Sequence, residues 1–234
     1  MNIYSTAHII CYFTLMILLF SGIYGGNDLL FYIKPLSGLG LIFLYFKEKS
    51  KVSLLYPFII LIIMINDAFI LQDFETNFRI VGILLPSFYL FNIYLLTPYI
   101  RYKNFQIKKL VSLPVVVTIF LIVYLTISIL NMVFTKLEGS LAFVILILVS
   151  LFSYLIACFL VYLQSNYTHT IYLFMSASGS IFVNAMVPIH ELYLPHNFFA
   201  AILNVIDFIS MFLFLQFLIK AELKDKGSVG VEYF

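Results

Sequence analysis

Two aspartates inside apolar stretches are the residues of this sequence best placed to do chemistry. Asp67 lies near the end of the run Leu54–Leu71, and Asp207 lies within the run Phe198–Ile219. Placing an aspartate at the centre of a membrane helix costs roughly 3 kcal/mol, so its carboxylate must face a polar cavity, pair with a basic group or hold a proton. We therefore interpret Asp67 as a catalytic or ligand-facing carboxylate, with a structural ion pair to Lys34 as the alternative.

Polar residues in other apolar runs are further candidates. Two roles fit Lys34: binding a lipid phosphate as a compact positive charge, or reaching the membrane interface with no further role. Ser180 and Asn184 are four residues apart and so share one face of a helix, which suits either ligand contact or close helix packing. Tyr89 and Tyr94 fit either the lining of a cavity or hydrogen bonds between helices.

The sequence His190-Glu191, followed by His196, contains side chains that can bind zinc. Their spacing is not that of the His-Glu-x-x-His motif, and no fourth ligand is evident. We therefore expect these residues to lie in a solvated loop, and we predict no metal and no cofactor.

The composition of the chain is that of a membrane protein. It has 234 residues, of which 63% are hydrophobic and 10% are charged. A soluble domain averages about 45–50% apolar and about 25% charged residues. The net charge of +2 gives no reason to expect a nucleic-acid partner. The sequence therefore predicts an all-α polytopic membrane bundle.

Eight apolar runs approach the ~20 residues that cross a bilayer as a helix. They are Ile3–Ile23, Leu29–Phe46, Leu54–Leu71, Ile80–Ile100, Leu110–Phe134, Ser140–Leu163, Thr170–Ile189 and Phe198–Ile219.

The basic residues predict the orientation of these eight spans. Most of them fall in the loop 47–51, the loop 101–109 and the tail after Lys220. Eight spans place all three segments on one side, which is cytoplasmic because Lys and Arg are enriched in cytoplasmic loops. Both termini are then cytoplasmic, residues 1–220 form the transmembrane domain, and 221–234 form a short cytoplasmic tail. Asp67, Lys34 and Asn184 come to lie toward the outer face.

Short motifs along nearly the whole chain resemble those of one family of membrane proteins. The positions are Lys34-Pro35 at the second span, Asn66-Asp67 for Gly-Asp in the third, Tyr94 for the Tyr of His-x-x-Tyr in the fourth, Val183-Asn184 for Ser-Asp in the seventh, and Leu215-Gln216 for Ala-Gln in the eighth. With these motifs the chain resembles a divergent member of the YhhN/TMEM86 family of eight-span, lysoplasmalogenase-like proteins.

The resemblance implies a hydrolase that cleaves the vinyl-ether bond of a lysophospholipid, with a membrane lipid or lysophospholipid as its partner. Two carboxylates suit this acid/base chemistry, and the family positions are Asp67 and residue 184. Here residue 184 is Asn184, whose amide does not exchange a proton at ordinary pH. Asp207 is a replacement only if its helix turns it inward.

The orientation of the last span separates two of the candidates. Gln216 lies nine residues after Asp207, and at 100° per residue it points to the opposite side of the helix. If Gln216 faces the site as in the family, Asp207 points away, so replacement by Asp207 is not favoured. The implied catalytic positions are Asp67 and Asn184. The candidate substrate-binding residues are Lys34, Asn66, Ser180, Gln216, Asp207 and Tyr94.

Two other functions fit the same residues. One is a non-catalytic member of the same fold that binds or transports a lipid or amphiphile, and the other is a proton-coupled transporter that uses Asp67 and Asp207. The high content of Ile, Phe, Asn and Lys is typical of an AT-rich bacterial genome, so we expect an integral protein of the bacterial inner (plasma) membrane.

Overall fold

The computed structural model describes residues 6–49, 52–100, 126–127, 131, 136, 139–164 and 166–223. The regular structure of these residues is helical, with an isolated β-bridge between Tyr167 and Leu223. The elements are α1 (Thr6–Glu48), α2 (Leu55–Leu96), the 3-10 helix η1 (Thr97–Tyr99), α4 (Leu141–Gln164), α5 (Ile171–Leu192) and α6 (Asn197–Lys220). The predicted all-helical class is confirmed for this part of the chain.

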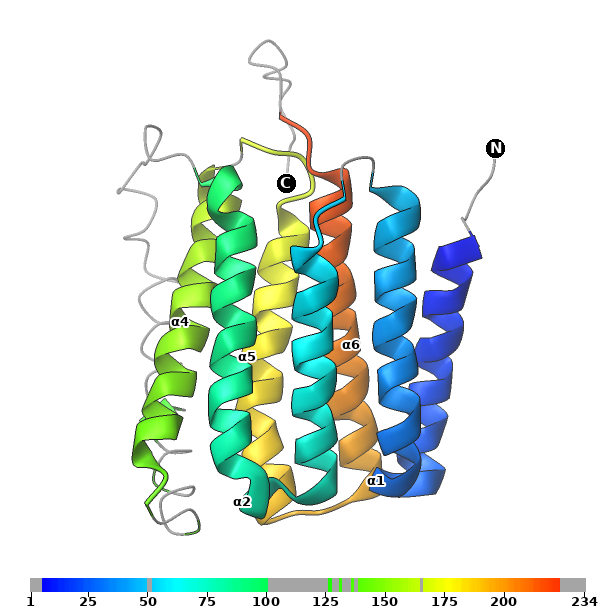
Figure 1. Cartoon of the computed structure of the whole chain (residues 1–234), viewed down its shortest axis with the longest axis vertical. Coiled ribbons are helices and arrows are strands. Elements are labelled where there is room, and N and C mark those ends of the chain that lie inside the picture. Colours follow the sequence, from blue (N-terminus) through cyan, green and yellow to red (C-terminus); the bar gives the residue numbers. More distant parts are fainter. Residues whose placement is uncertain are drawn as a thin grey trace, which may run out of the picture.

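Helices α1 and α2 each consist of two helices joined at a sharp kink, and Figure 1 shows that the two halves of each lie side by side. The kink in α1 is at Gly26, with φ 59° and ψ −155°, a backbone region that is essentially restricted to glycine. The kink in α2 is at Asp73, where the backbone is extended. The first four predicted runs correspond to these four half-helices, and Leu110–Phe134 lies almost entirely outside the described residues.

The helices have the length and composition of membrane spans. In the described part of the chain, five helices are long and apolar enough to cross a membrane, with α1 and α2 each counted once. Large apolar side chains are exposed on the bundle surface; Phe13, for example, is 65% exposed. An exposed apolar surface of this kind is stable in lipid but not in water. The chain is an integral membrane protein.

The ends of the helices separate the basic residues from the kinks. Figure 1 shows the start of α1 and the end of α6 at one end of the bundle, and the two kinks at the other. Lys47 and Lys220 lie in the last turns of α1 and α6, at the first of these ends. Lys49 also lies there and donates a hydrogen bond to the backbone carbonyl of Leu218. The predicted grouping agrees with this arrangement for the loop 47–51 and the start of the tail, whereas the loop 101–109 lies outside the described residues.

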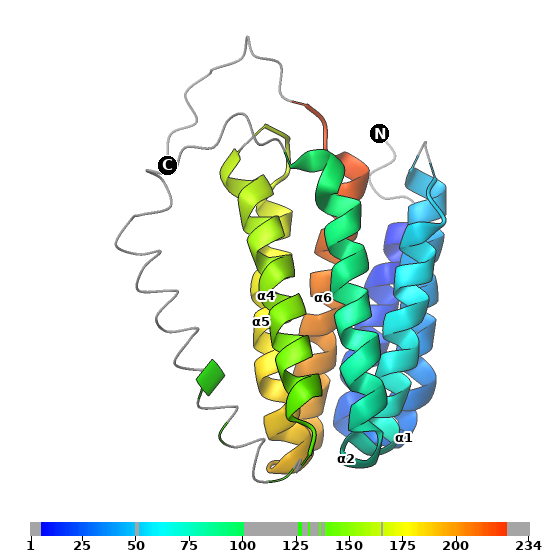
Figure 2. The ribbon, with the colours of Figure 1, turned by 60° about the vertical axis from the view of Figure 1, so that its left-hand side comes forward.

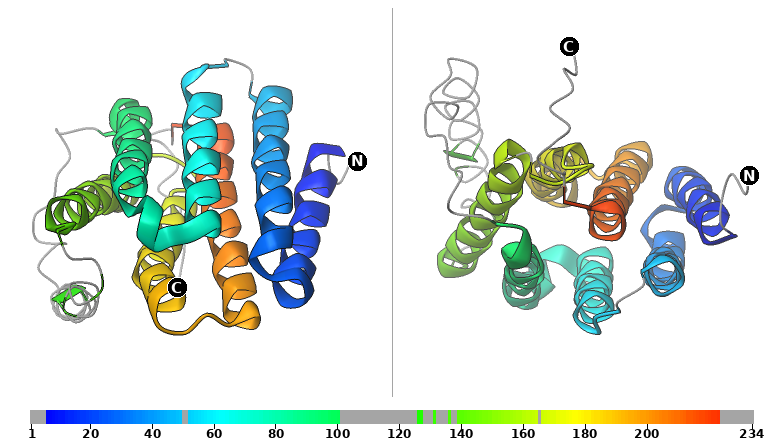
Figure 3. Two further views of the ribbon diagram at one scale, coloured as in Figure 1. Left: turned by 60° about the horizontal axis from the view of Figure 1, so that its bottom comes forward. Right: turned by 90° about the horizontal axis from the view of Figure 1, so that it is seen from above.

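The helices pack in two rows when the bundle is seen end-on. In Figure 3, α4, α5, α6 and the first half of α1 form one row, and the second half of α1 and both halves of α2 form the other. Figure 2 shows the same helices running close to parallel. The most extensive contacts are between α6 and its neighbours α1 and α5, and between α2 and α4. Residues on the inner sides of both rows therefore face one another.

Small residues allow α5 and α6 to approach closely. A Cβ atom added at Gly179 would overlap the side chain of Ser210 on α6. Gly179, next to Ser180, therefore serves the close packing of α5 against α6.

Candidate functional site

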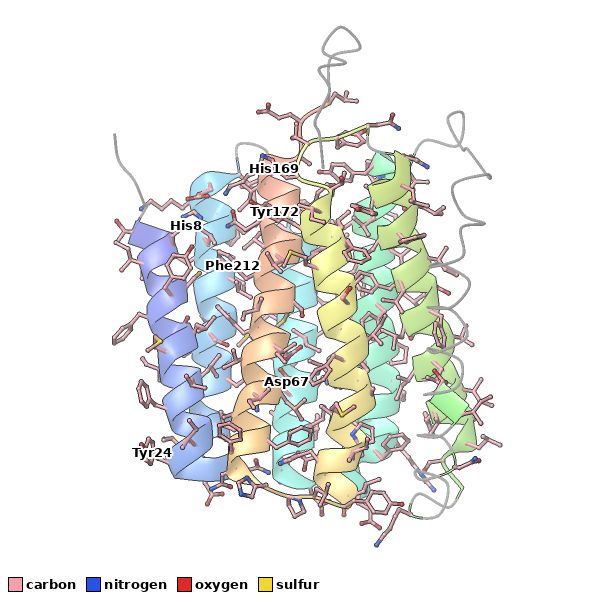
Figure 4. All side chains as sticks on the ribbon, turned by 180° about the vertical axis from the view of Figure 1, so that it is seen from behind. His8, Tyr24, Asp67, His169, Tyr172 and Phe212 are labelled. Carbon is pink, nitrogen blue, oxygen red and sulfur yellow. The ribbon has the colours of Figure 1, made fainter. Side chains whose placement is uncertain are left out.

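A cluster of three charged side chains lies inside the bundle. The ammonium of Lys34 is 2.9 Å from Asp67 Oδ2 and 3.2 Å from Asp207 Oδ2. The three side chains are 13%, 7% and 19% exposed, respectively. They come from the second half of α1, the first half of α2 and α6, and Figure 4 shows Asp67 in the interior of the bundle. We call Lys34, Asp67 and Asp207 the charged triad.

The structure reverses the expectation for the last helix. Asp207 points inward and contacts Lys34, whereas Gln216 points elsewhere. Asp207 and Gln216 contact different halves of α1, Asp207 the second half at Lys34 and Gln216 the first half at His8. The choice between them was wrong because a buried ammonium and a carboxylate attract strongly in a medium of low dielectric constant. This attraction turns Asp207, and not Gln216, toward Lys34.

The charges of the triad do not balance. One ammonium and two carboxylates leave one negative charge in excess when all three groups are ionised. Buried charges are tolerated when they are paired. The single positive charge of Lys34 can neutralise only one of the two carboxylates that it contacts. A proton or one further cation would neutralise the triad.

A cavity of about 180 Å³ opens next to the triad. Its walls come from α1, α2, α4, α5 and α6 and are mainly apolar, with Phe88, Tyr154 and Phe214 among the aromatic side chains. An engineered cavity of about 150 Å³ binds benzene, so this one is large enough for a small apolar group. Polar side chains that could orient a ligand line the same cavity: Lys34, Asn66, Asp67, Ser180, Asn184 and Asp207.

Asn66 is a buried amide in the cavity wall. The residue is 1% exposed, and its side-chain oxygen has no hydrogen-bond partner among the described residues. The hydroxyl of Tyr56, in the same wall, has none there either. An unsatisfied buried polar group costs about 1–3 kcal/mol, so both groups are available to a ligand. No sequence pattern distinguished Tyr56 from the other tyrosines, of which the chain has 17 in all.

Asn184 lines the cavity and is held in place by two bonds. Its side-chain nitrogen donates to the hydroxyl of Tyr89 and to the backbone oxygen of Ser180, 2.8 Å away. An amide nitrogen has two hydrogens, so a ligand can bond only to the carbonyl oxygen of this side chain. Tyr89 is itself buried, and its ring lies 5.3 Å from that of Tyr154. The predicted cavity role of Tyr89 agrees with this position.

Two predicted site residues lie away from the triad. Gln216 is buried beside His8, with its Nε2 atom 3.2 Å from the Nε2 atom of that histidine. His8 also pairs with Glu48 at 2.9 Å, and Figure 4 places His8 near the end of the bundle opposite Tyr24. Tyr94 is 69% exposed on the outer surface. Neither Gln216 nor Tyr94 lines the cavity, so the expectation that they contact the substrate is corrected.

His190 differs from the expectation of a solvated loop, whereas His196 is exposed as expected. His190 is 4% exposed, and its Nδ1 atom lies 2.8 Å from Glu191 Oε1. Both residues line the cavity, whereas His196 accepts a hydrogen bond from the backbone of Phe198 at the start of α6. The part of the chain that the structure describes contains no group of three His, Cys, Asp or Glu side chains that could hold a metal ion.

Comparison with known proteins identified no relative of this chain. No family model, curated protein or solved structure matches the chain. The resemblance to the YhhN family therefore stays a prediction from the motifs, and the function must be argued from the charged triad and the cavity.

Proposed function

We propose that this chain is a membrane-embedded, lysoplasmalogenase-like hydrolase that cleaves the vinyl-ether bond of a lysophospholipid. The observation that supports the proposal is the contact of two carboxylates, Asp67 and Asp207, with one buried ammonium at the wall of an apolar cavity. Vinyl-ether hydrolysis needs one carboxyl group as an acid and one as a base in the same site. Asp207 supplies the carboxylate that the seventh span lacks at Asn184.

The two carboxyl groups have different roles in this reaction. Asp67 has the more enclosed side chain and acts as the acid: its proton goes to the vinyl carbon remote from the ether oxygen, and an oxocarbenium ion forms. Asp207 is more exposed and takes a proton from water as the water oxygen bonds to the carbon next to the ether oxygen. In the resulting hemiacetal, the bond between the carbon and the glycerol oxygen breaks and the hydroxyl proton moves to the glycerol oxygen. The products are a fatty aldehyde and the free glycerol hydroxyl. The proton on Asp207 then returns to Asp67.

Lys34 and the amide side chains position the reacting groups. The ammonium group of Lys34 contacts both carboxylates and stabilises whichever of them is ionised. Asn66 bonds the substrate with its unpartnered amide oxygen, and Asn184 offers its carbonyl oxygen to water. The cavity volume of about 180 Å³ suits the reacting segment and the first methylenes of the chain, so the rest of the lipid extends beyond it.

The proposal includes the topology predicted from the sequence. The chain crosses the membrane eight times, both termini are cytoplasmic, and the charged triad lies toward the outer face of a bacterial inner membrane. The grouping of Lys47, Lys49 and Lys220 at one end of the bundle supports this orientation. Labelling of single cysteines introduced near Lys220 and near Glu75 tests it, because only the first should be shielded in intact cells.

Aldehyde release from lysoplasmalogen by the purified protein tests the activity. We expect turnover by the native chain, and a loss of at least about 100-fold in Asp67→Asn and in Asp207→Asn, because acid/base groups typically contribute 10²–10⁴-fold. Glu75→Gln is the matched control, because it makes the same type of charge change at an exposed residue that does not line the cavity. Absence of aldehyde from the native chain, or full activity in Asp67→Asn, would contradict the proposal.

A second candidate is a non-catalytic protein of the same fold that binds a lipid or amphiphile. The residue that favours it is Asn184, whose amide cannot transfer a proton at the family's second catalytic position. Its side-chain nitrogen is already bonded to Tyr89 and Ser180. Protection of the fold by lysophospholipid with no product formed would favour this candidate over hydrolysis.

A further inference from the structure

We propose that the cavity is a binding site for a monovalent alkylammonium ion, which exchanges with the proton that otherwise neutralises the charged triad. The ligand class is an organic cation with one primary ammonium group and a short alkyl chain. Binding breaks no bond in the ligand, so this site stands whether or not the protein hydrolyses vinyl ethers.

The charges around the cavity favour a cation over an anion. Lys34 is the only lysine or arginine among the described residues that line the cavity, and it already contacts both carboxylates. The remaining ionisable groups add no positive charge to the triad: Glu191 pairs with His190, and the hydroxyl of Tyr89 bonds to Asn184. With both carboxylates ionised, the triad has a net charge of −1. An ammonium ion neutralises this charge, whereas a phosphate or carboxylate group would add to it.

Asn66 provides an independent reason to expect a polar ligand at this place. The residue is 1% exposed and lines the cavity, and its side-chain oxygen has no hydrogen-bond partner among the described residues. Asp67 lines the same cavity, so a ligand nitrogen bound at that carboxylate can also donate to the Asn66 oxygen. An ammonium N–H donated to this oxygen would satisfy a buried acceptor that the protein leaves unpaired.

The other walls of the cavity fit the apolar part of such a ligand. The lining is mainly apolar, and the aromatic rings of Phe88, Tyr89, Tyr154 and Phe214 are part of it. Aromatic faces attract a cation within about 6 Å, and apolar walls favour burial of methylene groups. The volume of about 180 Å³ admits the ammonium head and part of an alkyl chain.

Exchange with a proton makes binding depend on pH. Without ligand, one proton neutralises the triad, and a bound ammonium ion replaces it. Because the ligand competes with that proton, the affinity of the cavity for the alkylammonium ion increases with pH. The increase is up to about tenfold per pH unit where a full proton is released. The charged and titratable groups that face the triad or the cavity are Lys34 on α1, Tyr56, Asp67 and Tyr89 on α2, Tyr154 on α4, His190 and Glu191 on α5, and Asp207 on α6.

The site relates to the proposed hydrolysis in one further way. After Asp67 gives up its proton, the substrate is an oxocarbenium ion and the triad has its net charge of −1. An alkylammonium ion bound in the same cavity would place its positive charge beside the triad as the oxocarbenium ion does. If the protein is also a hydrolase, octylammonium inhibits it competitively.

The test compares three ligands of equal chain length on the native protein in nanodiscs of zwitterionic lipid: octylammonium, octanol and octanoate. At pH 7.5 we expect octylammonium to bind at least about tenfold more tightly than octanol, and octanoate to bind most weakly. Calorimetry in buffers of different ionisation enthalpy should show one proton released per octylammonium bound. Equal binding of octylammonium and octanol, or binding without proton release, would overturn the proposal.

Two variants separate charge from shape. Asp207→Asn leaves one carboxylate for Lys34, so we expect the preference for octylammonium over octanol, and the proton release, to disappear. Asn66→Leu keeps the charges, so we expect weaker binding with proton release retained. Glu75→Gln, at an exposed residue outside the cavity, should match the native chain in both readouts. If Asp207→Asn does not fold, the ligand comparison on the native chain still decides. These readouts need no turnover, so a failure here and a failure of the hydrolase assay are distinguishable.

Discussion

Removal of the Lys34 ammonium is the perturbation that most directly tests the charged triad. Lys34→Met keeps the length of the side chain and leaves Asp67 and Asp207 in the bundle without the cation that both contact. Loss of one partner from a buried ion pair costs about 3–5 kcal/mol. Total stabilities are about 5–15 kcal/mol, so this substitution should lower the unfolding temperature strongly.

The effect should also depend on pH, with a sign that follows from the charges. Without the ammonium, the folded state favours the protonated forms of both aspartates, because two carboxylates without a cation repel each other in a medium of low dielectric constant. The folded state then binds more protons than the unfolded state, so the stability of Lys34→Met falls as pH rises. Lowering the pH should recover part of the loss.

Thermal unfolding in a neutral detergent from pH 5 to pH 8 measures both effects. Lys220→Met is the matched control, because Lys220 is exposed at the end of α6 and should show a change of less than about 0.5 kcal/mol. Adding Asp67→Asn and Asp207→Asn to Lys34→Met removes the uncompensated charges and should restore stability, since neutral replacements of a buried ionic group are often tolerated. An unfolding temperature for Lys34→Met equal to that of the native chain at pH 8 would refute the reasoning.

Three further predictions test the site and the two kinks. Asn184→Asp restores a carboxylate at the family's second catalytic position, so aldehyde release from lysoplasmalogen should rise; unchanged or lower release in the folded variant would count against hydrolysis. Gly26→Ala places a Cβ at φ 59° and should destabilise the protein by about 1–3 kcal/mol in thermal unfolding, whereas Gly40→Ala, in a helix where the new Cβ would meet Ile10 and Thr14 only at ordinary van der Waals distances, should not. The backbone N–H and the hydroxyl of Thr76 hold the pKa of exposed Asp73 below its usual value, so its stabilising effect is present above about pH 4 and is lost as pH falls. Asp73→Ala should therefore be less stable than the native chain near neutral pH and differ little from it in acid; a constant difference would show that these bonds are not responsible.

Hydropathy was sufficient to find the helices of the bundle, because a helix in lipid must be apolar along its whole length. The run Leu141–Gln164, for example, was predicted as Ser140–Leu163. The sequence also indicated Lys34 as the partner of Asp67, because it was the nearest basic residue expected at that depth. Position along the helix axis follows from residue number at 1.5 Å per residue, so depth can be read from the sequence.

Rotation about the helix axis could not be read in the same way. A helix without one clearly polar side gives no signal for which side faces its neighbours, and α6 is such a helix, because its polar residues are spread around it. The choice between Asp207 and Gln216, and the outward position of Tyr94, depended on contacts between helices far apart in the sequence. The excess negative charge beside Lys34 and the unpartnered amide oxygen of Asn66 likewise exist only in the folded bundle. The sequence by itself determined which segments form apolar helices and where along each helix the charges lie, because both depend on one helix at a time. Only the tertiary structure decided which charges meet, because that depends on how the helices turn to pair their buried groups.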